Sequence, residues 1–172
     1  MLGEISKCKK CKLCKNQRPL LDKNNSCDIM WVGLSAKKVE DVNKTIPLCN
    51  DTNSGKIIEK IENKLNDFRF YKTNLVKCLP LDKNNKLRYP TIEEMNSCIE
   101  NLLLEINYYK PKIVFALGKN TYNFIHKYFV SNNIDTSNIY YIEHPSYIYI
   151  YKRKYIDNYI EKIKNICQKY IR

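Results

Sequence analysis

Short apolar runs that end at a turn residue recur along the chain and predict buried β-strands. The first covers residues 28–33, the second residues 70–76 and the third residues 112–117, where Gly118 stops the run. A fourth run lies near residues 139–142. Runs of this length with little polar alternation are typical of strands that are covered on both faces of a sheet.

Between these strands, apolar residues recur at the three- and four-residue spacing of an amphipathic helix. Residues 52–68 have this pattern, with Ser54 as the expected N-cap. The sequence TIEE at residues 91–94 forms a capping box that opens a second helix. Further helices are predicted from about residue 120 to 128 and from Lys152 onward.

This alternation of strands and helices predicts an α/β fold, a three-layer α/β/α sandwich around a central, mainly parallel four-stranded sheet. Ligands bind at the carboxyl ends of the strands in such sheets, so residues that follow a strand are candidates for a site. We expect a single domain over residues 1–172, because this length suits one domain and no repeat or low-complexity segment divides it. Residues 1–27 form a basic lead-in with several cysteines.

Composition narrows the location and the partners of the protein. Hydrophobic residues make up 44% of the chain, which excludes wholesale disorder. No stretch approaches the roughly 20 apolar residues of a membrane helix, and the start of the chain is unlike a signal peptide, so we expect a cytoplasmic protein without a membrane partner. A net charge of +12 favours a polyanion such as nucleic acid. The many lysines are equally typical of an A+T-rich genome, so charge alone leaves DNA binding open.

Eight cysteines in a chain expected in a reducing compartment indicate a metal site rather than disulfides. Three of them share C-x2-C-x2-C spacing near the N-terminus: Cys8, Cys11 and Cys14. Cys78 and Cys98 lie in the middle of the chain. Four thiolates suit either tetrahedral zinc or an iron–sulfur cube. The cysteines that we expect to be ordinary buried thiols are Cys27, Cys49 and Cys167.

Four segments stand in a particular order: CKKCKL at residues 8–13, TNLVKC at 73–78 followed by Pro80, PKIVFALG at 111–118, and HPSY at 144–147. This order resembles the iron–sulfur uracil-DNA glycosylases, the fourth family of the uracil-DNA glycosylase superfamily. The motifs of that family read C-x2-C-x-L, TN-x-VKC-x-P, P-x-IV-x2-LG and HPSY, and its P…E…C stretch fits Pro90, Glu93 and Cys98. The resemblance covers roughly residues 8–150.

The resemblance implies a cofactor and a reaction. A [4Fe–4S] cluster would tie residues 1–27 to the domain through four ligands: Cys8, Cys11, Cys78 and Cys98. Leu13 favours the Cys8 and Cys11 pair, although replacement of one ligand by Cys14 stays open. The implied activity is that of a monomeric DNA glycosylase in base excision repair, which hydrolyses the N-glycosidic bond of uracil or a related damaged base. The base would be flipped out of single- or double-stranded DNA.

The same resemblance assigns roles to two polar residues, one at the end of the second strand and one after the fourth. Asn74 would read the Watson–Crick edge of uracil, because a carboxamide offers both an acceptor and a donor for N3–H and O4. His144 would be catalytic, since a histidine can hydrogen-bond O2 of the departing base as negative charge grows there. We expect the other histidine, His126, to be a packing residue.

The segment after His144 is a candidate DNA surface. Ser146 and Tyr147 would contact phosphates beside the extruded nucleotide, and Lys152 and Arg153 would extend that surface. The alternating tyrosines and isoleucines of residues 147–151 fit a DNA-facing loop. They fit equally well an edge strand that leads into an amphipathic helix.

The first motif departs from the family, which reads Gly-Glu-Ala-Pro-Gly where this chain reads GLSAK at residues 33–37. Gly33 is kept as part of the substrate pocket, but Leu34 occupies the position of the acid that helps to place the attacking water. Ser35 can hydrogen-bond a water and is our candidate there. Leu48 falls near the family's phenylalanine that stacks on uracil, and it offers apolar contact without a ring.

Two charged pairs near this motif have ordinary explanations. Lys37 and Lys38 suggest an amine nucleophile, but phosphate contact or solvation is the better interpretation. Glu40 and Asp41 match the family's downstream acidic pair in position, and we expect them to lie in a solvated loop. Because Leu34 is not an acid, an alternative is a catalytically weak or inactive iron–sulfur nucleic-acid-binding protein of the same fold. A zinc-ribbon adaptor is a third, less favoured reading.

Overall fold

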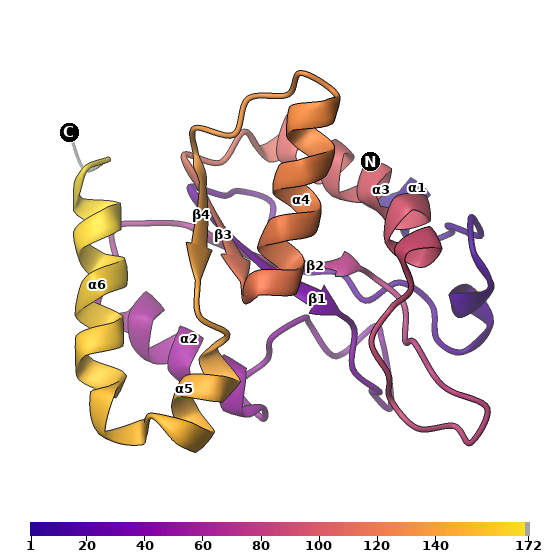
Figure 1. The fold of residues 1–172 in the computed structure, drawn as a ribbon, viewed down its shortest axis with the longest axis horizontal. Coiled ribbons are helices and arrows are strands. Elements are labelled where there is room, and N and C mark those ends of the chain that lie inside the picture. The colour runs from indigo at the N-terminus through magenta and orange to yellow at the C-terminus, as the bar shows by residue number, and fades with distance from the viewer. Residues whose placement is uncertain (171–172) are drawn as a thin grey trace.

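The computed structural model describes residues 1–170, and its centre is a four-stranded sheet. In spatial order the strands are β2 (Phe70–Val76), β1 (Ile29–Ser35), β3 (Ile113–Leu117) and β4 (Ile139–Ile142) (Figure 1). All three pairings between neighbouring strands are parallel. The predicted α/β fold with a parallel four-stranded sheet is therefore confirmed. The last two positions of the predicted domain, residues 171–172, lie outside the described residues.

Helices connect the successive strands and follow the last one. The connecting helices are α2 (Asn53–Asn63), α3 (Ile92–Tyr109) and α4 (Lys119–Ser131). The helices after β4 are α5 (Pro145–Tyr151) and α6 (Ile156–Gln168). The lead-in contributes a short helix, α1 (Leu2–Ile5), and a 3₁₀ turn at Lys12–Lys15. No helix within residues 1–170 combines the length and the apolar character that a membrane span requires.

Two apolar clusters, one on each face of the sheet, make the three layers. Met30 and Val32 of β1 belong to a cluster that includes residues of α3 and α4. Ile29 and Trp31 point to the opposite face and pack with residues of α2, α5 and α6. Because side chains alternate along a strand, one apolar run serves both clusters, which is why it shows no polar alternation. Figure 1 shows helices on both sides of the sheet.

The helix between β1 and β2 differs from the prediction at both ends. Its N-cap is Thr52, whose hydroxyl accepts the N–H of Gly55 at 3.0 Å, and not Ser54. It ends at Asn63 instead of residue 68, and Leu65 and Phe68 reach the core from tight turns. By contrast, the capping box between Thr91 and Glu94 at the start of α3 is present in both of its hydrogen bonds.

Residues 145–151 form helix α5, so the interpretations of this segment as a loop or an edge strand are both wrong. Pro145 stands at the first helical position, where its fixed φ suits a helix and its missing N–H costs nothing. His144 caps the helix through its side chain. These two signals outweigh the alternating tyrosines and isoleucines. The predicted closing helix begins at Ile156, after a 3₁₀ turn at Arg153–Tyr155.

The strand order creates a crevice at one end of the sheet. From β1 the chain crosses to β2 on one side, and it later returns to β3 on the other side of β1. The connections that leave β1 and β3 therefore diverge at the carboxyl ends of these strands. Such a switch point is where open α/β sheets bind their ligands.

Candidate functional site

A pocket of about 690 Å³ opens at this switch point. Every strand contributes to its wall through residues near its carboxyl end or just after it: residues 33–35 from β1, Asn74 from β2, residues 117–121 from β3 and His144 from β4. The two side chains that the sequence singled out for reading a base and for catalysis, at positions 74 and 144, thus lie in one pocket.

Asn74 is held against the backbone of the neighbouring strand. It is 3% exposed, and it pairs in register with Gly33 of β1. A Cβ added to Gly33 would stand 2.3 Å from Asn74 Oδ1 and 3.5 Å from Leu48 Cδ2. Glycine at this position therefore allows the carboxamide and Leu48 to approach the strand at the pocket wall.

Leu48 reaches the pocket from a loop that packs closely on a helix. Its backbone has φ 53°, in the left-handed region. A Cβ on Gly55 of α2 would lie 1.9 Å from the carbonyl oxygen of Cys49 and 2.6 Å from that of Leu48. The loop backbone thus lies directly on the first turn of α2, and this contact fixes the apolar side of the pocket.

The two ring nitrogens of His144 differ: Nδ1 is hydrogen-bonded, whereas Nε2 has no hydrogen-bond partner within residues 1–170. The backbone N–H of Ser146 donates to Nδ1 at 3.3 Å, and Ser146 Oγ lies 2.9 Å from the same atom. Because an N–H can only donate, Nδ1 is an acceptor, and the proton of the neutral ring is on Nε2. Burial lowers the pKa of His144, which favours this neutral form. The ring packs beside Gly118, where a Cβ would lie 3.4 Å from His144 Cβ.

The first turn of α4 makes this pocket favourable for negative charge. Gly118 is the N-cap of α4 and offers no side-chain acceptor to the N–H groups of that turn. Lys119 and Asn120 follow it and line the pocket. The positive end of the helix dipole and the ammonium group of Lys119 therefore act on whatever anion the pocket holds.

The described part of the pocket wall contains no aspartate or glutamate. Leu34 and Ser35 both line it, as the sequence predicted for this loop, but neither is an acid. Glu40 and Asp41 line a different pocket, together with Lys38. Among residues 1–170, no carboxylate is therefore placed to act as a general base on a water in this pocket.

Lys37 lines the pocket but is engaged by Asp51. Its Nζ lies 2.7 and 2.8 Å from the two carboxylate oxygens of Asp51. Partial burial lowers the pKa of Lys37, but the hydrogen bond to Asp51 and the nearby Cys49 outweigh it, so that the pKa is raised. A charged, paired ammonium is not a nucleophile. The idea of an amine nucleophile at Lys37 thus finds no support.

The same contact corrects one expectation about the cysteines. Cys49 is partly exposed, and its Sγ lies 2.7 Å from Asp51 Oδ1. It is therefore not an ordinary buried thiol, because the loop that positions Leu48 keeps it near the surface. The other two cysteines in that group, Cys27 and Cys167, are buried as expected.

A second, smaller pocket gathers sulfur atoms. The cysteines that line it are Cys8, Cys11, Cys14, Cys78 and Cys98. Asn101 of α3 donates through Nδ2 to Cys8 Sγ at 3.4 Å and to Cys98 Sγ at 3.8 Å. Burial raises the pKa of the Cys78 thiol, and the neighbouring thiols add to this effect. The fold thus assembles the four predicted ligands, together with Cys14, from the lead-in, the end of β2 and α3.

The four candidate DNA-binding residues divide into two groups. Ser146 and Tyr147 line the main pocket, whereas Lys152 and Arg153 lie outside its wall. Lys152 Nζ pairs with Glu143 Oε1 at 2.8 Å and lies 5.3 Å from the centre of the Tyr147 ring. The guanidinium of Arg153 lies 5.3 Å from the ring of Tyr149. Each of the two cations therefore lies over the ring of a tyrosine of α5.

Several pocket residues were not found from the sequence. Lys119 and Asn120 directly follow β3, so the rule that sites lie at strand ends contained the signal. Leu87 and Tyr89 line the pocket from the loop before α3, and both are exposed. The sequence marked these two residues only by their size and apolar character within an otherwise polar loop. Ile150 and Tyr151 belong to the segment predicted as a DNA-facing loop, and they line the pocket from helix α5.

Comparisons with known proteins give one family. The model of the family described as "Uracil DNA glycosylase superfamily" matches residues 17–166. A curated protein of Saccharolobus solfataricus named type-4 uracil-DNA glycosylase is 30% identical over 129 residues, which is 72% of this chain and 56% of that protein. A protein of the same name from Archaeoglobus fulgidus is 30% identical over 133 residues, 75% of this chain and 63% of its own length.

A third relative and a solved structure extend the comparison. The type-4 uracil-DNA glycosylase of Sulfurisphaera tokodaii is 29% identical over 158 residues, which cover 89% of this chain and 67% of that protein. The chain thus spans between 56 and 67% of the length of these curated relatives. The crystal structure of wild-type SMUG2 from Pedobacter heparinus superimposes with a TM-score of 0.57, at 18% identity, over 83% of this chain and 77% of that one. This likeness supports the fold.

Proposed function

The chain belongs to the uracil DNA glycosylase superfamily, and on that premise we propose that it is a DNA glycosylase that hydrolyses the N-glycosidic bond of uracil or a related base in DNA. The observation that carries the proposal is the placement of Asn74 and His144 in one pocket at the carboxyl ends of the strands. The names of the curated relatives, all type-4 uracil-DNA glycosylases, support the same substrate. The lead-in, residues 1–27, and the rest of the chain would form a single domain.

Asn74 would recognise the base. A uracil that enters the pocket presents O4 and N3–H, which match the donor and the acceptor of one carboxamide. Because this carboxamide lies directly against the backbone of Gly33, it can be held in one orientation before the base arrives. Preorganised hydrogen bonds discriminate against a base with the opposite donor pattern, since that base would leave buried polar groups unpaired.

His144 would stabilise the leaving group. When the bond between C1′ and N1 breaks, its electron pair stays on the base, and negative charge grows on O2. The Nε2–H of neutral His144 is the donor that we assign to O2. The uncapped first turn of α4 and Lys119 add favourable potential for the same anion.

The attacking water would have a weaker partner than in relatives with an acid in the first motif. Ser35 can accept or donate one hydrogen bond to a water on the sugar side of the pocket, but it cannot take a proton at neutral pH. Leu34 adds only apolar surface. Much of the acceleration would then come from binding and from stabilisation of the departing anion, which does not require a general base.

The sulfur-lined pocket would hold a [4Fe–4S] cluster through Cys8, Cys11, Cys78 and Cys98. The donor set supports it, because five cysteines line this one pocket and thiolates are the ligands of such a cube. Within residues 1–170, no three Cys, His or acidic side chains converge on a single metal-ion position. Four thiolates also supply the ligand count of the cube. When bound, the cluster would serve as a structural tie between the lead-in, β2 and α3.

DNA would cross the mouth of the pocket along α5. Ser146 and Tyr147 stand at the wall, where flanking phosphates of an extruded nucleotide would lie, and Lys152 and Arg153 follow on the same segment. One copy of the chain supplies all of these residues, so a monomer suffices for the proposed activity.

The absence of an acid from the first motif favours a second candidate function. A protein with Leu34 in this position would recognise an extruded base in DNA without cleaving its glycosidic bond. It would use the same pocket and the same basic segment. The two functions differ only in turnover, so one assay separates them.

The test is incubation with oligonucleotides that carry a single uracil, in single- and double-stranded form, followed by alkaline cleavage of abasic sites. We expect scission with the wild-type protein and its loss in Asn74→Ala and His144→Ala. Matched controls are Asn138→Ala, whose side chain binds the carbonyl of Pro111, and His126→Ala, whose ring packs against Tyr122. Tight binding without scission on uracil or hypoxanthine would favour the second function.

A further inference from the structure

A fully buried ion pair lies directly behind Asn74. The side chains of Lys77 and Glu105 are both 0% exposed, and Lys77 Nζ is 2.7 Å from Glu105 Oε2. Removing two charges from water is expensive, and a buried pair of this kind is often no more stabilising than apolar residues of the same volume. Fold stability alone therefore does not account for its position behind Asn74.

The ammonium group of Lys77 binds the main chain of Asn74. Besides Glu105, Nζ donates to the carbonyl oxygen of Asn74 at 2.8 Å and to Thr73 Oγ1 at 2.8 Å. An ammonium has three protons, so these three acceptors satisfy it fully. With its carbonyl held in this way, Asn74 has a fixed peptide plane, and the direction in which its side chain leaves the strand is fixed with it.

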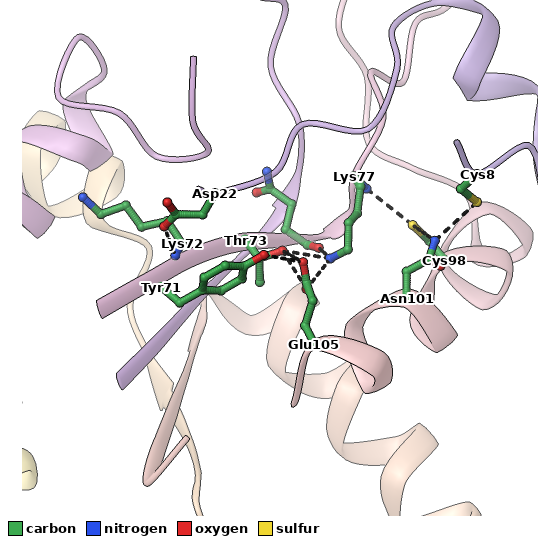
Figure 2. A network of polar contacts seen from close by, with 10 residues as sticks. Cys8, Asp22, Tyr71, Lys72, Thr73, Lys77, Cys98, Asn101 and Glu105 are labelled. Carbon is green, nitrogen blue, oxygen red and sulfur yellow. Dashed lines mark hydrogen bonds and ion pairs between the residues drawn. The ribbon is translucent and has the colours of Figure 1, made fainter. Parts of the chain in front are cut away.

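Glu105 extends the same restraint along β2. It accepts a hydrogen bond from Tyr71 OH at 2.9 Å and from Thr73 Oγ1 at 2.9 Å. Tyr71 and Thr73 point toward α3, whereas Asn74 is the next residue and points to the other face, beside Gly33. The network therefore holds the strand from its α3 face, opposite the carboxamide. Figure 2 shows Tyr71, Thr73 and Lys77 converging on Glu105.

The other end of Lys77 is anchored at the sulfur-lined pocket. Its backbone N–H donates to Cys98 Sγ at 3.4 Å. Cys98, Asn101 and Glu105 are three and four residues apart on α3, so they share one face of this helix. Figure 2 shows this face, from the sulfurs of Cys8 and Cys98 to the carboxylate of Glu105. Helix α3 thus sets Asn74 at a fixed distance from the cysteines.

We propose that Lys77 and Glu105 are positioning residues for base recognition: they fix the main chain of Asn74 from behind, so that its carboxamide meets the base in one orientation. The backbone of Gly33 restrains the carboxamide from the front, and the ion pair supplies the opposing support. The inference rests on the proposed function in one respect, namely that Asn74 reads a base.

The test is a double-mutant cycle between the ion pair and Asn74. Lys77→Met alone leaves a buried, unpaired carboxylate, which endangers folding, so both charges are removed together in Lys77→Met/Glu105→Gln. The carboxamide introduced at position 105 retains an acceptor for Tyr71 and Thr73. We expect kcat/KM for uracil release to fall at least about ten-fold in the wild-type background. The cycle itself is measured as the dissociation constant of free uracil, which needs no turnover: we expect this constant to rise at least about ten-fold in the wild-type background and less than about two-fold in the Asn74→Ala background. Equal losses in the two backgrounds would show a general effect on the fold and would overturn the inference.

A second ion pair, between β2 and α2, provides the matched control. Lys72 Nζ lies 2.9 Å from Glu62 Oε2, and both side chains are largely buried. Lys72→Met/Glu62→Gln removes one charge from β2 and one from α2, and neither residue lines the main pocket. We expect this variant to retain the kcat/KM of the wild type. A loss as large as that of the Lys77 variant would contradict a specific role for Lys77.

A spectroscopic measurement keeps this inference separate from the proposed function. The side-chain amide signal of Asn74 in ¹⁵N-labelled protein can be assigned by its absence in Asn74→Ala. We expect it to shift or broaden in folded Lys77→Met/Glu105→Gln and to stay unchanged in the Lys72 control. An unchanged signal would overturn the positioning role, even in an active enzyme. A shifted signal in a protein that releases no uracil would support the positioning role while contradicting the proposed function.

Discussion

At the scale of single residues, two glycines decide what can stand in the pocket. Gly33 lies beneath the carboxamide of Asn74, and Gly118, with φ 86°, lies beside His144. Each makes room for one of the two polar side chains on which the proposed function depends. Asn74 and His144 can thus take up their positions because the neighbouring residue in each case has no side chain.

Gly33→Ala tests this arrangement. A methyl group 2.3 Å from Asn74 Oδ1 displaces the carboxamide, while the strand itself can keep its pairing. We expect kcat/KM for uracil to fall at least about ten-fold, the worth of one or two hydrogen bonds, with little change in the melting temperature. Gly3→Ala is the control, because nothing lies within 4 Å of the added methyl there. Unchanged kinetics in a folded Gly33→Ala protein would refute the role of this contact.

His144 gives a prediction for pH. Burial lowers its pKa in the folded protein below the unfolded value of about 6.5, so the unfolded state binds the proton first as pH falls. The stability that neutral His144 contributes is present above that pH and is lost below it, as pH falls toward the lowered pKa. We expect the difference in melting temperature between wild type and His144→Gln to shrink in that acidic range. A difference that grows on acidification would mean that the folded protein prefers the charged ring.

Removal of the imidazole should affect the chemical step more than binding. We expect His144→Gln to lower kcat by about 10²–10³-fold, as for the loss of one donor to a developing anion, with a smaller change in KM. Single-turnover kinetics on a uracil oligonucleotide measure this directly. A change confined to KM would instead identify His144 as a binding residue.

At the scale of elements, the sequence predicted a strand or helix correctly where one pattern was present and no second pattern contradicted it. The apolar run that ends at Gly118 fits no helical pattern, so the strand there was clear. The family resemblance singled out Asn74 and His144, and the strand-end rule predicts that both lie at the same edge of the sheet. Helix α5 could not be predicted from alternation, because the cap at His144 and Pro145 acts against it. The Lys77–Glu105 pair was out of reach for another reason. It joins residues 28 positions apart, and nothing local marks a lysine as buried.

The segment after α5 carries a prediction about DNA binding. Arg153 is exposed beside Tyr149 and has no carboxylate partner within residues 1–170, whereas Lys152 is paired with Glu143. We expect Arg153→Gln to weaken binding to DNA of any sequence and to reduce the log–log salt slope by about 0.7–0.9, one phosphate contact. Lys162→Gln on the exposed side of α6 is the charge-matched control. An unchanged salt slope in Arg153→Gln would remove this residue from the DNA surface.

At the scale of the whole molecule, the sulfur-lined pocket is what joins residues 1–27 to the sheet and α3. Cys78 and Cys98 are buried within it, whereas Cys14 is an additional cysteine on its wall. We expect Cys78→Ser to lose the broad visible absorption of an iron–sulfur cluster and to become sensitive to proteolysis in the lead-in. Cys14→Ser should keep both properties. A colourless wild-type protein that contains zinc would contradict the cluster and favour an adaptor.

The most direct test of the central claim, that Asn74 and His144 act together in one pocket to free a base, is mass spectrometry of the base released from a uracil-containing oligonucleotide. We expect free uracil from the wild-type protein and an intact oligonucleotide from Asn74→Ala and from His144→Ala, each folded as judged by circular dichroism. An intact oligonucleotide after incubation with folded wild-type protein, or undiminished release by either variant, would contradict the claim.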